Sequence, residues 1–422
     1  MASTERLYDM CVVGAGIIGS AAARHASMIA RISVCVIGPD EPQSRSVDDG
    51  REIYGAHYDE GRITRNSDED RAWAVFAQES IKRYRYLEKA SGINFYNEVG
   101  YIIAGDKDGE FIHQSTEMVQ GLDTYYVDPA EMKKQFPFFD FNANDAGIYE
   151  QKSSGFISPR NMIKAQLKLA QLNGCDVIID VVSDITRILS EDKENVMEIK
   201  TDSGKKIMSK KVLIATGAFT SFRNLLGKDI HPDVNLFGAN VAKVEINEND
   251  ARNLSDMPSV YYCGKGQGHW NKEFPGCQSG EYRFYMLPPI KYPDDRYYIK
   301  MGFRLDIGDI HLSNIEAVKN WYCSGGIPSV NKAVATLITD VVTDISMVSF
   351  HGDCCVICTT PTRRPYIDMI HSQLGVAIGG NGWAAKSGDE IGRIAAMLVI
   401  KNEWDSSLPK EYFKFRCKTE NV

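Results

Sequence analysis

The chain opens on a short apolar run, Tyr8 to Val13, which is followed at once by the glycine-rich segment GAGIIG at 14–19. Residues 20–26 are mostly small, so a helix there would pack closely on the strand before it. A second apolar run follows at 32–37. This order of strand, glycine turn, helix and strand is the context that a dinucleotide fingerprint requires. An ordinary βαβ unit with a glycine turn is the alternative.

Farther along, the spacing of apolar residues predicts alternating helices and strands. One amphipathic helix is expected at 68–90 and another at 159–173, which Gly174 ends. Shorter predicted elements are a strand–turn–strand at 94–104, a helix opening at 128–132, and strands at 175–179, 186–199 and 206–214. The last strand closes in Ala215-Thr216-Gly217, where small residues let the backbone approach a bound nucleotide. A tight strand-to-helix turn is the alternative there.

From about residue 235 to 350 the pattern changes to short, aromatic-rich β segments. The segments at 260–262, 282–287 and 297–303 predict an antiparallel sheet, interrupted by a helix at 313–321. Near the C-terminus a strand at 376–378, a glycine turn at 379–382 and a helix at 387–401 follow the same order as at the N-terminus. We therefore predict an α/β (α+β) fold in which a Rossmann-type domain and an antiparallel β-sheet domain interleave.

The predicted division places two domains on five segments. Residues 1–90, 151–234 and 351–422 are expected to form the nucleotide-binding domain. Residues 91–150 and 235–350 are expected to form the substrate domain. A chain of 422 residues is long enough for two such domains.

The amino-acid composition and net charge limit the kinds of molecule that the protein is expected to bind. Hydrophobic residues at 43% and charged residues at 25% are typical of a globular protein. A net charge of −8 without a dense lysine or arginine block argues against nucleic acid and anionic membrane as partners. No apolar run approaches the ~20 residues of a membrane helix, and the first strand leaves no room for a signal peptide. We expect an intracellular protein, in the cytoplasm or an organelle matrix, that is a monomer or a small homo-oligomer.

The ten cysteines are scattered rather than set in a disulfide framework. Without a secretion signal we expect them to be reduced and to behave as small hydrophobes. Cys355 and Cys358 have the spacing of half a zinc site. No second pair or histidine cluster follows, so we expect no metal.

Each glycine of the first turn has its own expected structural role. Gly14 permits the tight turn, Gly16 lets the backbone approach a pyrophosphate, and Gly19 lets the helix pack on the strand. After the second strand, the fingerprint normally has an acidic residue for a ribose hydroxyl. Gly38 stands there instead, and Asp40 is the substitute candidate.

A polar, glycine-containing stretch at 44–65 is too charged for a core and too long for a turn. Loops of this length in compact domains are usually functional or disordered. Arg51, His57, Arg62 and Arg65 are its candidates for contact with phosphate, flavin or a substrate carboxylate. A solvated loop whose charges pair with one another is the alternative.

Taken in order, these motifs resemble the D-amino-acid-oxidase-like superfamily of FAD amine oxidases, most closely its monomeric sarcosine oxidase and N-methyltryptophan oxidase branch. The segments GAGIIG at 14–19 and YDEGR at 58–62 are similar to the flavin fingerprint and the loop after it. SSGFISP at 153–159 and LIATGAF at 213–219 resemble a turn and an FAD-contacting strand of the family. The resemblance covers nearly the whole chain, and it implies that the cofactor is FAD.

The resemblance also implies where FAD binds. The residues expected to contact it are Gly14, Gly16, Ile17, Ile18, Gly19, Asp40, Arg45, Ser46, Arg51, Val182, Thr216, Gly217, Cys355, Gly380, Asn381, Gly382, Ala385 and Lys386.

Cys355 lies six residues before Pro361, the place of the cysteine that the family bonds to the flavin 8α-methyl group. The resemblance therefore implies FAD bound covalently through Cys355. The alternatives are a free structural cysteine, or Cys354 or Cys358 in its place.

The resemblance implies two catalytic residues. Lys300 in YIKMGF resembles a lysine near flavin N5, where a fixed cation stabilises the superoxide formed from oxygen. A solvated lysine on an edge strand is the alternative. Tyr285 resembles the aromatic residue on the substrate side of the flavin, although strand tyrosines are common. Aromatic residues that could form an amine-binding wall, or equally the core of the sheet, are Tyr261, Tyr262, Trp270, Phe284 and Tyr285.

The C-terminal glycine turn at 379–388 resembles one whose N–H groups and helix dipole face the flavin pyrimidine edge. Where sarcosine oxidase has a lysine for the substrate carboxylate, this chain has Ala384, and Lys386 follows two residues on. Asp48-Asp49 replace a histidine-containing pair of the first loop. An altered substrate pocket is therefore expected, which disfavours sarcosine itself. Candidates for substrate contact are His57, Arg62 and Lys386.

The function that the resemblance implies is oxidation of the C–N bond of a secondary or tertiary amine or an N-substituted amino acid. A hydride equivalent passes to flavin N5, the imine hydrolyses, and oxygen is reduced to hydrogen peroxide. The partners expected are therefore a small-molecule amine and oxygen. The alternatives are a dehydrogenase or biosynthetic oxidase of the same fold that passes electrons elsewhere, and a flavin-binding protein without turnover. An NAD-dependent enzyme is the least favoured.

Overall fold

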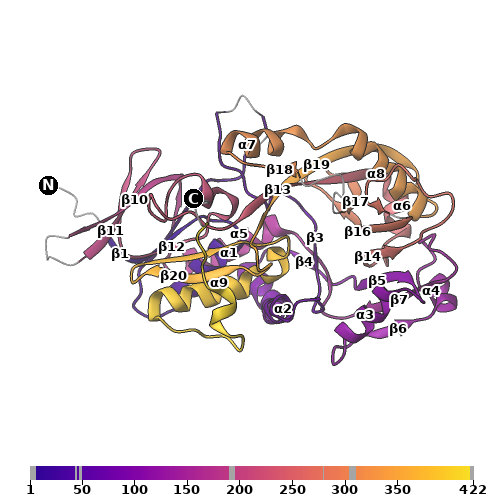
Figure 1. The fold of residues 1–422 in the computed structure, drawn as a ribbon, viewed down its shortest axis with the longest axis horizontal. Helices are drawn as coiled ribbons and strands as arrows, with labels where there is room; N and C mark the ends of the chain where they lie inside the picture. The colour runs from indigo at the N-terminus through magenta and orange to yellow at the C-terminus, as the bar shows by residue number, and fades with distance from the viewer. Residues whose placement is uncertain are drawn as a thin grey trace.

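The computed structural model describes residues 6–42, 45–46, 50–189, 195–278, 280–303 and 310–418. Two large sheets make up the molecule, one on the left and one on the right of Figure 1. A small sheet lies between them and consists of β3 (Arg62–Thr64), β8 (Gly155–Ile157) and β4 (Tyr96–Asn97). The α/β fold with an interleaved second sheet domain is confirmed.

The left-hand sheet has a parallel centre. Its parallel strands, in spatial order, are β9 (Asp176–Ile179), β2 (Val34–Gly38), β1 (Leu7–Val13), β12 (Lys206–Ile214) and β21 (Leu374–Ile378). Antiparallel strands extend it, namely β10 (Val182–Leu189) and β11 (Asn195–Thr201) beside β12, and β20 (Tyr366–His371) beside β21. The central strands read as unbroken apolar runs because both faces of a parallel sheet are covered.

Helices α1 (Ile17–Ser27), α5 (Pro159–Leu172), α9 (Ala384–Lys401) and α2 (Arg71–Ser91) pack together against this sheet. The small residues of α1 make the packing close, and Ala21, Ala22 and Ala23 are wholly buried. A side chain at Gly19 would overlap the Gly14 carbonyl. The role predicted for Gly19 in helix packing therefore agrees with the geometry.

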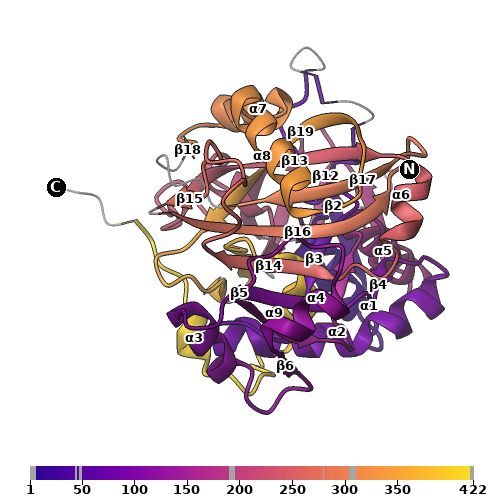
Figure 2. The same cartoon turned by 90° about the vertical axis from the view of Figure 1, so that its right-hand side faces the viewer.

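The right-hand sheet is larger and strongly twisted (Figure 2). Its order is β18 (Ile310–His311), β13 (Asn235–Ile246), β17 (Tyr297–Gly302), β16 (Glu281–Lys291), β14 (Ser259–Gly264), β5 (Tyr101–Asp106), β7 (Asp145–Glu150) and β6 (Tyr125–Val127). In addition, β19 (Met347–Thr359) pairs with β13, and β15 (Cys277–Gln278) pairs with β16. The strands are antiparallel except for β5 and β14, which are parallel. The antiparallel pairing predicted for the segments at 260–262, 282–287 and 297–303 is confirmed, and the parallel pair of β5 and β14 adds the segment at 101–106 to the same sheet.

Shorter helices surround the right-hand sheet. They are α3 (Glu110–Met118), α4 (Pro129–Gln135), α6 (Glu248–Asn253), α7 (Ile315–Ser324) and α8 (Pro328–Val341). Helices α7 and α8 pack on β13 and β19 at the upper right of Figure 1. None of the helices in the described part of the chain has the length and apolar character needed to cross a membrane.

Most predicted elements are present, with shifted ends. The first long helix begins at Arg71 rather than residue 68, because Asp70 caps it by accepting a hydrogen bond from the Ala72 amide. The last helix begins at Ala384, three residues earlier than predicted. Helix α8 was not predicted, and neither was the extent of β13 and β19. The predicted domain boundary between residues 350 and 351 falls inside β19.

Candidate active site

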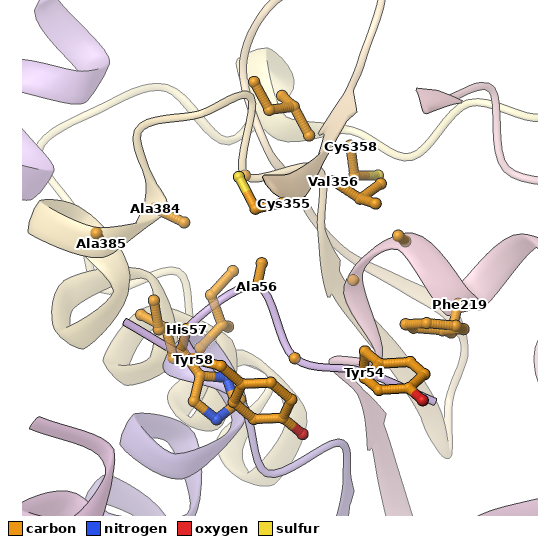
Figure 3. Close-up of a pocket in the computed structure, with 18 of the residues that line it drawn as sticks. Tyr54, Ala56, His57, Tyr58, Phe219, Cys355, Val356, Cys358, Ala384 and Ala385 are labelled. Atoms are coloured by element: carbon orange, nitrogen blue, oxygen red, sulfur yellow. The ribbon is translucent and has the colours of Figure 1, made fainter. Parts of the chain in front are cut away.

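A cavity of about 460 Å³ lies where the two large sheets meet. The carboxyl ends of β1, β2, β9, β12 and β21 all open towards it, as ligand sites do in parallel sheets. Segments from both ends of the chain line it, so the cavity exists only in the folded protein. Figure 3 shows its inner part.

One wall is the glycine turn between β1 and α1. Gly14 has a φ of +104°, and a side chain there would meet the Ala215 carbonyl. Gly16 is the N-cap of α1, has no side-chain cap, and has open space where a Cβ would stand. The first N–H groups of α1 therefore lack helical partners and face the cavity. A backbone cradle of this kind fits a pyrophosphate, so the residues present fit FAD.

A second glycine turn also lines the cavity. Gly379, Asn381 and Gly382 have φ values of +82°, +50° and +86°. The Asn381 side-chain oxygen accepts a hydrogen bond from the Thr360 amide at 2.9 Å, and the Asn381 backbone N–H donates to the Cys358 carbonyl at 2.9 Å. These bonds attach the turn to the end of β19. Helix α9 begins here without a side-chain cap, so a second helix N-terminus borders the cavity.

Cys355 borders the cavity from β19, across from Ala384 and Ala385 (Figure 3). Its neighbour Cys354 also borders the cavity, but its thiol donates a hydrogen bond to the Trp321 carbonyl at 2.7 Å. Burial raises the pKa of the Cys355 thiol, while the nearby Arg62 and Lys300 act in the opposite direction. All ten cysteines are free thiols.

Lys300 does not line the cavity but lies in its supporting wall. The side chain is fully buried in β17, and its ammonium contacts the Asp59 carboxylate and the Gly61 carbonyl, the latter at 2.9 Å. Asp59 does line the cavity and also pairs with Arg62. Burial and the Arg62 charge lower the pKa of Lys300 to about 8, although Asp59 opposes them.

A second buried cluster joins Arg65, Lys386 and Asp68. Lys386 Nζ lies 2.5 Å from Asp68 Oδ2, and Arg65 Nη2 lies 3.5 Å from the same oxygen. Arg65 also donates to the Tyr101 hydroxyl. Burial lowers the pKa of Lys386 to about 8 against the attraction of Asp68. Two cations at the cavity thus share one carboxylate.

Only part of the predicted aromatic wall borders the cavity. Tyr261 and Tyr285 do, and they are opposite each other on β14 and β16. Tyr262, Trp270 and Phe284 instead pack in the core of the right-hand sheet, which was the alternative. Sequence alternation alone did not separate these two faces, because both carry aromatic residues.

His57 borders the cavity beside Tyr58 (Figure 3). The two rings meet edge to face with centroids 4.6 Å apart. Burial, with Arg160 and Arg62 nearby, lowers the pKa of His57 to about 3. The imidazole is therefore neutral at physiological pH.

The predicted FAD contacts divide into two groups. Those that line the cavity are Gly14, Gly16, Ile17, Ile18, Arg45, Val182, Thr216, Gly217, Cys355, Gly380, Asn381, Gly382, Ala385 and Lys386. Gly19, Asp40, Ser46 and Arg51 are not among its described lining residues. Asp48 and Asp49 lie outside the described residues.

The replacement of an acid by Gly38 has a steric cause. A Cβ at this position would stand 2.6 Å from the Cβ of Ala15 in the glycine turn. Asp40, the substitute candidate, is mostly exposed and pairs with Arg51 at 3.4 Å. The structure therefore does not bring Asp40 to the cavity.

Sequence reasoning missed Asp59 and Tyr322, which border both the main cavity and a second one of about 300 Å³. Residues shared by the two cavities are Arg45, Tyr58, Asp59, Tyr322 and Asp353. Asp59 belongs to the YDEGR motif, so the signal for it was present. Within the described residues, no group of three or more His, Cys, Asp or Glu side chains is placed to hold a metal.

The fold and the glycine cradle define a class of protein. The chain belongs to the family of FAD-dependent oxidoreductases, whose pattern matches residues 9–398. It is an FAD-dependent oxidoreductase of the sarcosine and amino acid oxidase type, which confirms the resemblance.

Individual relatives are distant. Monomeric sarcosine oxidase from Arthrobacter sp. (strain TE1826) is 24% identical over 417 residues, which cover 96% of each chain. N-methyl-L-tryptophan oxidase from Yersinia pestis (strain Pestoides F) is 23% identical over 176 residues, 41% of this chain and 45% of the relative. Among solved structures, NikD, an unusual amino acid oxidase essential for nikkomycin biosynthesis, has a TM-score of 0.73 at 17% identity over 98% of both chains. L-proline dehydrogenase from P. horikoshii has a TM-score of 0.68 at 16% identity over 97% of both.

Proposed function

We propose that the protein oxidises the C–N bond of a secondary or tertiary amine that carries a carboxylate, such as an N-substituted amino acid, with oxygen as the electron acceptor. One observation supports this most directly: a continuous cavity joins the cradle at Gly14–Gly16 to the buried cations Arg65 and Lys386. FAD supplies the two-electron acceptor when it is bound. The chain itself binds and orients the amine.

The cation pair favours an anionic group on the substrate. Arg65 and Lys386 both contact the carboxylate of Asp68, and the charge of the buried Glu150 also acts on Lys386, from beyond ion-pair distance. A planar guanidinium binds a carboxylate with two parallel hydrogen bonds. A substrate carboxylate would therefore offset a buried charge that is otherwise costly.

The rest of the wall favours an unprotonated amine. Burial raises the pKa values of Tyr261 and Tyr285, so both phenols stay neutral. Arg62 acts on Tyr285 and Arg65 on Tyr261, and these positive charges disfavour a further cation. A neutral amine has the free electron pair that its oxidation requires, so no dedicated general base is needed.

Cys355 is the residue that we propose to bind the flavin covalently, and Lys300 the cation that we propose to stabilise superoxide. Supporting this, Cys355 borders the cavity and Lys300 is buried directly behind the lining residue Asp59. The sequence matches to the family at both positions agree with these roles.

A panel of amines tests the function. We expect an N-methyl amino acid to bleach the flavin without oxygen and to yield one hydrogen peroxide per turnover in air. Bleaching without peroxide would instead identify a dehydrogenase that uses another acceptor. A flavin that no amine bleaches would contradict the proposal and leave the non-catalytic alternative.

Replacing Arg65 tests the carboxylate site. Losing one partner of a desolvated charge pair costs about 2–5 kcal/mol, so Arg65→Met should raise KM for carboxylate-bearing amines by roughly 30-fold or more. Amines without a carboxylate should be affected much less. Arg283→Met, which changes an exposed arginine on β16, is the control. Equal losses for both amine classes would refute the carboxylate site.

The same site predicts a pH dependence. Lys386, with a pKa of about 8, is charged below that value and neutral above it. We therefore expect KM for carboxylate-bearing amines to rise as the pH increases through about 8. The rise should be absent in Lys386→Met, and its persistence there would assign it to another group.

A further inference from the structure

The buried pair of Lys300 and Asp59 is unusual because a lysine in the middle of a strand is completely enclosed. Lys300 has no exposed surface, and Asp59 is 3% exposed. Among the residues that the structure describes, the polar groups in contact with the ammonium are the Asp59 carboxylate and the Gly61 carbonyl. The two partners are 241 residues apart in the chain, so the tertiary fold alone creates this pair.

Asp59 is held on several sides. Besides Lys300, its carboxylate accepts hydrogen bonds from Arg62, from the Tyr292 hydroxyl at 2.7 Å and from the Glu60 amide at 2.8 Å. Two cations therefore share one carboxylate. Arginine cannot give up its proton in a protein, whereas a buried lysine can. If the carboxylate were absent, Lys300 would be the group that becomes neutral.

The other charged side chains near Lys300 form ion pairs with one another. Lys243 lies opposite Lys300 in the register of β13 and β17, and its ammonium is 3.4 Å from Asp353. Asp353, on β19, also binds Arg45 at 2.7 Å. Burial raises the pKa values of Tyr285, Tyr292 and Cys355, so these groups contribute no anion. Among the described residues, Asp59 is thus the carboxylate in contact with Lys300.

We propose that Asp59 is a positioning residue for Lys300, which holds the ammonium in the cavity wall as a charged group and thereby sets how fast the reduced protein reacts with oxygen. This inference rests on the proposed function, in which Lys300 stabilises superoxide. Oxygen takes one electron to become superoxide, then a second electron and two protons to become hydrogen peroxide. A fixed cation acts on the first of these steps because negative charge appears there.

The reaction with oxygen tests this directly. The flavin is reduced by light, without any amine, and mixed with oxygen over a range of pH. In the wild type the rate constant should fall as the pH rises through about 8, where Lys300 loses its proton. In Asp59→Asn the fall should occur at lower pH, which makes the reaction at least tenfold slower at neutral pH. Lys300→Met should be slow at every pH.

Two further variants guard against misfolding of Asp59→Asn. Asp59→Glu keeps the charge but moves it, so the reaction should slow while its pH dependence stays near that of the wild type. Tyr292→Phe removes one neutral hydrogen bond from Asp59 and should have a small effect. These results would separate positioning from a merely structural role.

The free energy of unfolding provides a readout that needs no flavin. Unfolded lysine has a pKa of about 10.4, so the unfolded chain binds more protons than the folded one between the two pKa values of Lys300. Stability should therefore increase with pH from about 8 upwards in the wild type. The increase should begin at lower pH in Asp59→Asn. In Asp59→Asn/Lys300→Met only the part of the increase that Lys386 contributes should remain, and that part is the same in every variant.

Wild-type profiles in Asp59→Asn for both oxygen and unfolding would overturn the proposal. A faster oxygen reaction in Asp59→Asn would also overturn the proposal, because the Asp59 charge would then weaken the effect of the Lys300 charge on oxygen. Since light rather than an amine reduces the flavin, a failure of the proposed amine substrate leaves this comparison intact. That separate failure would be seen as the absence of bleaching by any amine in the panel.

Discussion

Two lysines with similar surroundings lie at different places around the cavity. Lys386 is paired with Asp68 and Lys300 with Asp59, and burial lowers the pKa of each to about 8. Each lysine also has an arginine beside its aspartate, so each carboxylate is shared. At each place, one carboxylate thus contacts two cations.

Cys355 and Cys358 form a matched pair for testing the covalent bond. After acid precipitation, we expect the flavin to stay with the wild-type protein and to be released from Cys355→Ser. Cys358→Ser should behave as the wild type, because Cys358, although it also borders the cavity, packs in the core cluster and burial raises its pKa to about 12. Absorbance of the pellet and the supernatant measures the outcome. Flavin retained by Cys355→Ser would move the bond elsewhere or exclude it.

At the scale of elements, a buried polar network holds together the helices that border the cavity. Asp389 on α9 binds Arg24 of α1 at 2.7 Å, Arg83 of α2 at 2.5 Å and Gln166 of α5 at 2.7 Å. Its carboxylate has no exposed surface. The N-termini of α1 and α9 both face the cavity, so the network fixes the two helix ends that border the dinucleotide cradle.

Removing that carboxylate charge should destabilise the protein. Breaking a buried ion pair by changing one partner typically costs about 3–5 kcal/mol. We expect Asp389→Asn to lower the free energy of unfolding by that order, as measured by urea denaturation. Asp405→Asn removes an exposed carboxylate that pairs with Arg393 of α9. This change should lower the free energy of unfolding by about 1 kcal/mol or less. Similar effects of the two changes would mean that the buried network contributes no more to the free energy of unfolding than an exposed ion pair does.

At the scale of the whole molecule, β13 and β19 connect the two halves. They pair along their full length, from Asn235 with Thr359 to Ile246 with Met347. The end of β19 reaches the second glycine turn through Asn381, so the right-hand sheet is attached to the left-hand one at the cavity. A ligand bound there contacts both sheets and should stabilise them together.

Binding of FAD should therefore increase the free energy of unfolding. In flavin-free Cys355→Ser protein, free FAD at 100 times its Kd should add about 2.7 kcal/mol to the free energy of unfolding. ADP should give part of this gain, because the cradle at Gly14–Gly16 fits the pyrophosphate. Gly14→Ala should lose the response to both ligands, since its Cβ would meet the Ala215 carbonyl. Thermal shift measures the effect, and an undiminished ADP response in Gly14→Ala would contradict the cradle.

Local signals were sufficient for the elements near the cradle. Glycines after a strand, apolar periodicity and capping residues predicted β1, α1, α2 and α5 to within a few residues. The same signals failed for α8 and for the extent of β19, where an apolar run is compatible with either helix or strand. The parallel pairing of β5 with β14 was missed because the order of strands is not encoded locally.

By itself, the sequence determined the class of cofactor and the two glycine turns that line the cavity, since both depend on short segments whose backbone needs glycine. Only the tertiary structure decided which charges meet. The partners of Lys300 and Lys386 lie 241 and 318 residues away in the chain. Such pairs form because burial excludes water and each cation must then find an anion within reach. That requirement acts in space, so no spacing along the chain reveals it.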